Sequence, residues 1–137
     1  MTNMSPEQIA LVQSSFSSVM PRADQVAQDF YHRLFTAEPS FRAMFPRDMA
    51  EQRRKLMLTL TGVVQELARL DAIAPAIRAL AVRHVRYGVE ERHYPLVGAA
   101  LIAALRGEVA GFGDEHAAAW SVAYALIADT MIRAAYR

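Results

Sequence analysis

The sequence has 137 residues, of which 53% are hydrophobic and 21% charged, so it has the composition of a folded chain and the length of one domain, which we expect to span residues 1–137. Fifteen basic and 14 acidic residues leave a net charge of +1, which favours neither a nucleic-acid partner nor an anionic membrane. Cysteine is absent, so we expect no disulfides. The first twenty residues lack the apolar core of a signal peptide, and no apolar stretch is long enough to span a membrane. We therefore expect a cytoplasmic protein without a membrane partner.

Three helices are predicted in the first half of the chain. Residues 5–8 (Ser-Pro-Glu-Gln) match a helix start in which Ser5 and Gln8 form a capping box. Pro21 is expected to open a second helix, and Pro39 and Pro46 bracket a short irregular corner. The third helix carries residues three or four apart that we expect to face the core, namely Gln52, Leu56, Leu60, Val63 and Leu67.

The second half is also predicted to be helical. Pro75 is expected to begin a helix whose apolar stripe includes Ile77, Leu80, Ala81 and His84, and Gly88 is expected to interrupt it. A further helix is predicted from about Glu91, followed by a glycine-rich corner and a last helix; the corner residues are Gly107, Gly111 and Gly113. Because no segment shows sustained period-two alternation, the sequence predicts an all-α fold of about seven helices.

His84 is the first candidate for chemistry. It follows Leu80 and Ala81 by one turn on an apolar face, so its imidazole is expected to point inward. An inward histidine is more often a hydrogen-bonded core residue than a ligand, but a neutral imidazole is also the commonest protein ligand of metals. The other histidines are widely spread and form no HxxxH or HExxH pair, so a zinc site is not expected. From the residues alone, both interpretations of His84 remain open.

Two further polar residues are predicted on core-facing stripes. Tyr31 lies within an apolar helical face, and Gln52 lies one turn before Leu56 on another helix. Each has an ordinary explanation, since a buried tyrosine can bond to the backbone and a glutamine near a helix start can be solvated. Together with His84 on a third helix, they indicate a helical domain with a buried polar site.

Several segments resemble bacterial single-domain globins and the globin domains of flavohaemoglobins. The runs 30–35 (Phe-Tyr-His-Arg-Leu-Phe) and 52–56 (Gln-Arg-Arg-Lys-Leu) are similar to the second helix and the distal helix of these proteins. The run 81–89 (Ala-Val-Arg-His-Val-Arg-Tyr-Gly-Val), followed by 93–98 (His-Tyr-Pro-Leu-Val-Gly), resembles their proximal helix and the turn after it. The resemblance covers essentially the whole chain in one order, and it implies a globin fold that encloses a haem pocket.

The resemblance also implies a cofactor and a ligand set. The cofactor is haem b (iron protoporphyrin IX), held without covalent attachment because the CxxCH motif is missing. His84 corresponds to the proximal iron ligand, and Tyr31 and Gln52 correspond to the distal residues that stabilise a bound gas. The remaining positions predicted to bind the cofactor are Phe35, Phe45, Lys55, Leu56, Leu80, Arg83, Tyr87, Val89, Tyr94 and Val97.

One position departs from the family pattern. Flavohaemoglobins and several relatives have a glutamate near the end of the last helix that joins the proximal histidine and tyrosine; the register of Trp120 and Tyr124 aligns that position with Ala135. A carboxylate partner would increase the basicity of the imidazole, so its absence implies a proximal side like that of an oxygen-binding globin. The basic run 53–55 is expected to be a solvated face, with the alternative that Lys55 or Arg83 pairs with a haem propionate.

The resemblance implies reversible binding of O2, NO or CO at a five-coordinate iron. Bound O2 carries partial negative charge, so hydroxyl donation from Tyr31 implies high O2 affinity with slow release. We expect a function in O2 binding, storage or transport, and slow release suits storage, sensing or nitric oxide dioxygenation better than delivery. The alternative is a nitric oxide dioxygenase that depends on a separate reductase, which leaves the enzymatic status open. A sensor that relays haem ligation to a separate partner and a haem-free helical domain are two further alternatives.

Overall fold

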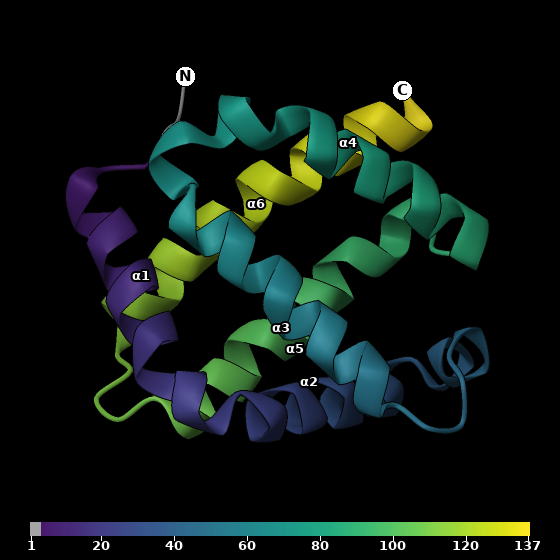
Figure 1. Cartoon of the computed structure of the whole chain (residues 1–137), viewed down its shortest axis with the longest axis horizontal. Helices are drawn as coiled ribbons and strands as arrows, with labels where there is room; N and C mark the ends of the chain where they lie inside the picture. The colour runs from purple at the N-terminus through teal and green to yellow at the C-terminus, as the bar shows by residue number, and fades with distance from the viewer. Residues whose placement is uncertain (1–3) are drawn as a thin grey trace.

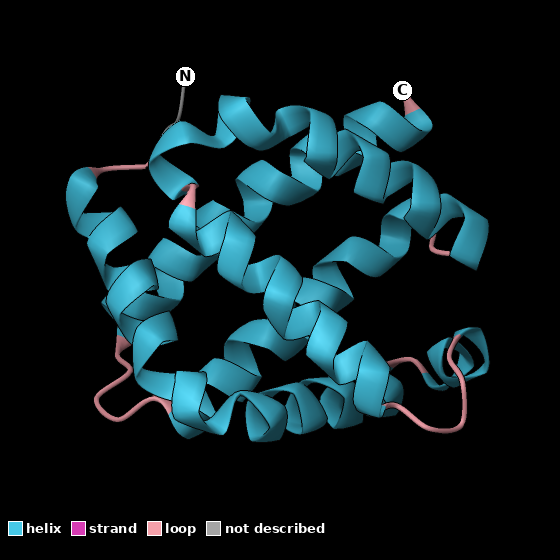
Figure 2. Cartoon of the chain, viewed as in Figure 1, coloured by secondary structure: helices cyan, strands magenta, loops and turns pink. Residues whose placement is uncertain are grey.

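The computed structural model describes residues 4–137, and Figures 1 and 2 show that this part of the chain is built from helices and short connections, without a strand. The six α-helices of the described part are α1 Pro6–Val19, α2 Ala23–Ala37, α3 Ala50–Gln65, α4 Leu70–Tyr87, α5 Tyr94–Glu108 and α6 Asp114–Tyr136. Short 3-10 helices cover the corners at Met20–Arg22, Pro39–Met44, Leu67–Arg69 and Glu91–His93. The all-α prediction is therefore confirmed, with a helix number close to the expected seven.

Two predicted helix boundaries are set by local chemistry. Ser5 Oγ accepts a hydrogen bond from the Gln8 N–H at 3.1 Å, and the Ser5 N–H donates to Gln8 Oε1 at 3.0 Å, so the capping box is present at the start of α1. Gly88 follows α4 with φ +100°, a left-handed conformation that favours glycine, and its N–H donates to carbonyls of the last turn.

The proline-based predictions of two helix starts were wrong. Pro21 lies in the 3-10 helix Met20–Arg22, and α2 begins only at Ala23. Pro75 lies inside α4, which begins at Leu70. Pro75 has no N–H to donate to the carbonyl of Asp71, but it is exposed, so water can bind that carbonyl while Leu70 and later residues pack inward.

Two further boundaries differ from the prediction by a few residues. The third helix ends at Gln65, so Leu67 lies in the following 3-10 helix, although it is buried as expected. Gly107 belongs to α5 rather than to the corner, and the corner is turned by Gly111, whose φ of +75° is left-handed.

The hydrophobic core is divided into two clusters. The larger cluster joins α1, α2, α3, α5 and the first half of α6. The smaller cluster joins α4, the start of α5 and the second half of α6 through Ile77, Ala81, Tyr94, Ala128 and Met131. Figure 1 shows the consequence, since α4 runs beside α6 along one edge while α2 lies at the opposite edge.

Helix α6 connects the two clusters. Trp120 Nε1 donates to Ser15 Oγ of α1 at 2.9 Å within the larger cluster. One turn later, the ring of Tyr124 packs against both clusters, and its hydroxyl donates to the carbonyl of Tyr94 at 2.6 Å. This approach requires glycine at position 98, because a Cβ there would lie 2.6 Å from Tyr124 Cε2.

Candidate functional site

Tyr31 of α2 and Gln52 of α3 are brought together by the fold. The Gln52 Nε2 amide donates to the Tyr31 hydroxyl oxygen at 3.1 Å, and Tyr31 is only 6% exposed. Because the phenolic oxygen accepts this bond, its own proton remains available for a second acceptor. Burial raises the pKa of Tyr31 and outweighs the opposing effect of the Gln52 bond, so the phenol stays protonated at neutral pH.

Aromatic rings hold Tyr31 in place. Phe30 meets it edge-on with ring centroids 4.9 Å apart, and the rings of Phe35 and Phe45 lie 5.7 and 5.5 Å from it. Phe45 reaches this cluster from the corner after the 3-10 helix Pro39–Met44, whose shape is fixed by Arg42 donating to the carbonyls of Phe45, Pro46 and Arg47. The hydroxyl of Tyr31 is therefore presented from a packed aromatic setting.

His84 lies in the last turn of α4 with its tautomer defined by the backbone. Its Nδ1 is 2.8 Å from the carbonyl oxygen of Leu80, and because a carbonyl only accepts, Nδ1 carries the proton. Nε2 is then the nitrogen with the free lone pair. Burial, with a smaller contribution from the Arg83 charge, lowers the pKa of His84, so the imidazole is neutral at pH 7. A neutral imidazole oriented by a backbone carbonyl is the form that binds iron.

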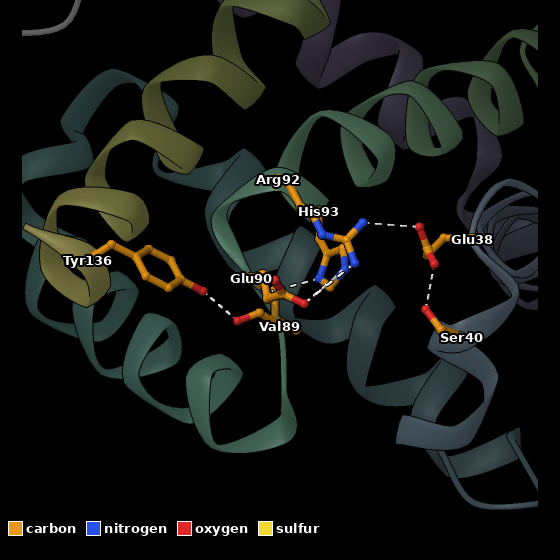
Figure 3. Close-up of polar contacts among 7 residues, drawn as sticks. All are labelled: Glu38, Ser40, Val89, Glu90, Arg92, His93 and Tyr136. Atoms are coloured by element: carbon orange, nitrogen blue, oxygen red, sulfur yellow. Dashed lines mark hydrogen bonds and ion pairs between the residues drawn. The ribbon is translucent and has the colours of Figure 1, made fainter.

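Tyr94 presents a buried hydroxyl next to this helix. The residue is 5% exposed, and within residues 4–137 its hydroxyl finds no hydrogen-bond partner. Burial raises the pKa of Tyr94 to about 12. Ala135 packs against the same cluster and offers no carboxylate, while the neighbouring Tyr136 donates its hydroxyl to the carbonyl of Val89 (Figure 3).

The turn between α4 and α5 is held by His93, which was not among the predicted site residues. His93 is 1% exposed, its Nδ1 accepts the Glu90 N–H at 2.9 Å, and its ring packs 4.4 Å from Phe41. Figure 3 shows that Arg92 also reaches Glu38 at the end of α2, 3.4 Å away. The segment that connects His84 to Tyr94 is thus fixed to the corner after α2. The sequence analysis included His93 only in the run 93–98, because its ring contact with Phe41 joins residues about fifty positions apart and no local pattern indicates it.

The predicted pocket residues fall into three groups. Those on the Tyr31 side pack against the larger cluster and comprise Phe35, Phe45, Leu56 and Val97. Leu80, Val89 and Tyr94 belong to the smaller cluster with the helix of His84. Lys55, Arg83 and Tyr87 are exposed; the Tyr87 ring lies 6.0 Å from that of His84.

The basic run on α3 is partly neutralised by carboxylates. Arg53 pairs with Asp24 at 2.7 Å, and Arg54 pairs with Glu51 one turn away. Arg54 is exposed, whereas Arg53 is half-buried, so the solvated face that we expected holds for Arg54 but only in part for Arg53. Lys55 has no such ion pair among the described residues. Of residues 53–55, only Lys55 is therefore still predicted to pair with an anionic group of the cofactor.

The side chains of the two clusters are chemically suited to a flat, largely apolar cofactor. The buried phenol of Tyr31 belongs to the larger cluster, and the neutral imidazole of His84 lies on α4, whose apolar residues form part of the smaller cluster. The described residues contain no group of three or more histidine or carboxylate side chains able to hold a metal ion, so iron would have to arrive with ligands of its own. An iron porphyrin meets this requirement, because it needs one protein ligand.

Comparison with known proteins identifies the family. The globin family model matches residues 28–131, and the chain belongs to the globin family. The flavohemoprotein of Bacillus thuringiensis subsp. konkukian is 30% identical over 132 residues, which are 94% of this chain and 33% of that protein. The chain thus spans about a third of the length of the flavohemoproteins that it matches. A globin-like protein of Aquifex aeolicus is 31% identical over 94% of this chain and 92% of its own length.

Solved structures agree with this assignment. A bacterial globin from Campylobacter jejuni superposes with a TM-score of 0.85 at 26% identity, covering 96% of each chain. An engineered carbene transferase from Rhodothermus marinus, whose parent is a candidate nitric oxide dioxygenase, also gives 0.85 at 25% identity over 97% of this chain and 94% of that one. The resemblance inferred from the sequence is confirmed. In the described part of the chain, no helix is long and apolar enough to cross a membrane.

Proposed function

We propose that this globin binds O2 reversibly and tightly, for storage or transport. The observation that carries the proposal is the Gln52–Tyr31 hydrogen bond, in which the phenol accepts and keeps its own proton for a further acceptor. Family membership supports haem binding, and we take the cofactor to be haem b. We further propose that residues 1–137 act as one domain and that the protein works in the cytoplasm.

Side chains from both clusters would contact a haem. His84 Nε2 would be the ligand for the iron, with the imidazole oriented by the bond from Nδ1 to the Leu80 carbonyl. Phe35, Phe45 and Leu56 would contact the ring on the Tyr31 side, and the exposed cations Lys55 and Arg83 would pair with the propionates. When bound, the haem supplies an iron atom whose open position takes a diatomic gas.

Tyr31 supplies the selectivity for a polar gas ligand. Its hydroxyl donates to a ligand that carries partial negative charge, and Gln52 fixes the direction of that donation through the phenolic oxygen. A hydrogen bond to a charged acceptor is worth about 1.5–3 kcal/mol, so this donor slows ligand release by about ten- to a hundred-fold. The donor stabilises bound O2 more than bound CO, because bound CO carries less charge.

A second candidate function is nitric oxide dioxygenation with a separate reductase. It is favoured by the similarity to the R. marinus protein and to the flavohemoproteins, of which this chain matches a third. Ala135 and the unpartnered Tyr94 hydroxyl favour the first function, because no carboxylate increases the basicity of the imidazole.

One series of spectra tests the proposal. Purified protein is reconstituted with haem, reduced, and exposed in turn to CO and air, with His84→Ala as the variant that lacks the ligand. We expect a stable oxygenated spectrum for the wild type and loss of haem from the variant. Unchanged haem uptake and spectra in His84→Ala would refute the assignment. Repeated NO consumption on addition of a reductase would favour the second candidate.

A further inference from the structure

The side of α4 that faces away from the core carries exposed apolar side chains between cations. Val82 and Val85 are 45% and 42% exposed, which is high for valine. Arg78 and Arg86 are exposed as well, and positions 78, 82, 85 and 86 share one helical face. We call these four residues the outer α4 face. His84 points to the other side of the same helix, where it bonds to Leu80.

The cations of the outer α4 face have no side-chain partner in the described part of the chain. Most arginines in residues 4–137 pair with a carboxylate within 4 Å, including Arg133 of the adjacent α6, which pairs with Asp129 at 3.0 Å. Within the same residues, the side chains of Arg78, Arg86 and the neighbouring Arg83 make neither an ion pair nor a hydrogen bond. The carboxylate nearest along this face is Asp71, seven residues before Arg78 and so about 10 Å away along the helix axis. The face is therefore positively charged around an apolar centre.

We propose that the outer α4 face is the docking surface for an acidic electron-donor protein that carries a reduced flavin. This inference rests on the proposed function, because a globin that becomes oxidised needs an electron to return to the ferrous state. An apolar centre with a charged rim is the usual composition of a transient protein interface. Unpaired arginines attract an acidic surface and speed its association.

The position of the face suits electron transfer. It lies on the helix that carries the iron ligand, so a docked protein is separated from the imidazole by the width of one helix, about 10 Å. One electron passes from the reduced flavin of the partner, which is oxidised by one electron, to ferric iron, which becomes ferrous. No covalent bond forms or breaks in this step.

Charge argues against a second copy of this chain as the occupant. A two-fold symmetric contact would bring the face onto itself. Arg78 and Arg86 would then meet arginines of the other copy with only Asp71 to offset them, which is unfavourable. An acidic partner has no such cost.

The test measures reduction of the ferric, haem-loaded protein by an acidic flavodoxin in stopped flow. The variant is Arg78→Glu/Arg86→Glu, and the matched control is Arg33→Glu/Arg106→Glu, which changes net charge equally at α2 and α5. At about 0.02 M salt we expect the flavodoxin rate to fall about tenfold in the variant and less than twofold in the control, and the difference to vanish at about 0.5 M salt. Reduction by dithionite stays unchanged in all proteins. An equal loss in variant and control, or no loss, would overturn the proposal.

A binding measurement separates this inference from the proposed function. In a titration with flavodoxin, the methyl signals of Val82 and Val85 are expected to shift in the wild type and to stay in place in the variant. This readout does not require haem, so failure of the chain to bind haem would refute the function while the shifts still test the surface. Methyl shifts elsewhere on the chain would overturn the inference. A dimer of the wild type in analytical sedimentation that is lost in Val82→Glu would also overturn the inference, because the outer α4 face would then bind a second copy of this chain.

Discussion

Replacing Tyr31 by phenylalanine removes one hydroxyl from a buried aromatic cluster and tests the distal side directly. The ring contacts with Phe30, Phe35 and Phe45 are retained. The substitution therefore removes only the hydroxyl, which donates to the bound ligand and accepts the hydrogen bond from the Gln52 amide. Loss of the donor costs about 1.5–3 kcal/mol if nothing replaces it. The freed Gln52 amide, 3.1 Å from the lost oxygen, is able to turn and donate a bond of its own. We therefore expect O2 to dissociate about tenfold faster in Tyr31→Phe and up to a hundredfold faster in Tyr31→Phe/Gln52→Leu.

The assay is displacement of O2 by excess CO in stopped flow, with the CO dissociation rate measured in parallel. CO release should change far less, because the ligand carries less charge. Thr36→Val serves as the control, since it removes a hydroxyl from an exposed residue of α2 that is not part of the predicted site and whose hydroxyl donates to the His32 carbonyl. An O2 dissociation rate in Tyr31→Phe equal to that of the wild type would refute the role of Tyr31. A double variant no faster than the single one would refute that of Gln52.

Three other substitutions have defined outcomes. His84→Ala should lose haem during gel filtration, and free imidazole should restore a haem spectrum by occupying the vacated space; restored binding is absent if His84 is only a core residue. Gly98→Ala should lower the free energy of unfolding by about 1–3 kcal/mol in urea titration, because the new Cβ lies 2.6 Å from Tyr124 Cε2, and an unchanged midpoint would contradict this. Tyr136→Phe should cost about 0.5–1.5 kcal/mol by removing the donor to the Val89 carbonyl, measured in the same titration; no loss would mean that water replaces the hydroxyl.

Local signals predicted those parts of the fold that depend on a few neighbouring residues. The capping box of Ser5 and Gln8 and the left-handed Gly88 are short-range features, and both are present. The prediction that a helix begins at Pro75 was wrong, because a proline marks a helix start only when the residues before it do not favour a helix. Here Leu70 and Ile73 gain burial against the core, which is enough to extend α4 one turn before the proline.

The candidate site was predicted only in part, again because local patterns do not report contacts between residues far apart in the sequence. Helical periodicity placed Tyr31 and Gln52 on inner faces, and the structure joins them across 21 residues. Periodicity could not give the direction of their hydrogen bond or the tautomer of His84, which depend on atomic contacts. It also missed the burial of His93, which is determined by Phe41 more than fifty positions earlier.

The two-cluster core has a consequence for the chain before it acquires a cofactor. With α4 supported mainly by α6, the amide protons of α4 should exchange with solvent faster than those of α2, which packs against both α3 and α5. A ligand that touches both clusters would equalise those exchange rates. Cofactor capture would then be the event that makes the two halves unfold as a single cooperative unit.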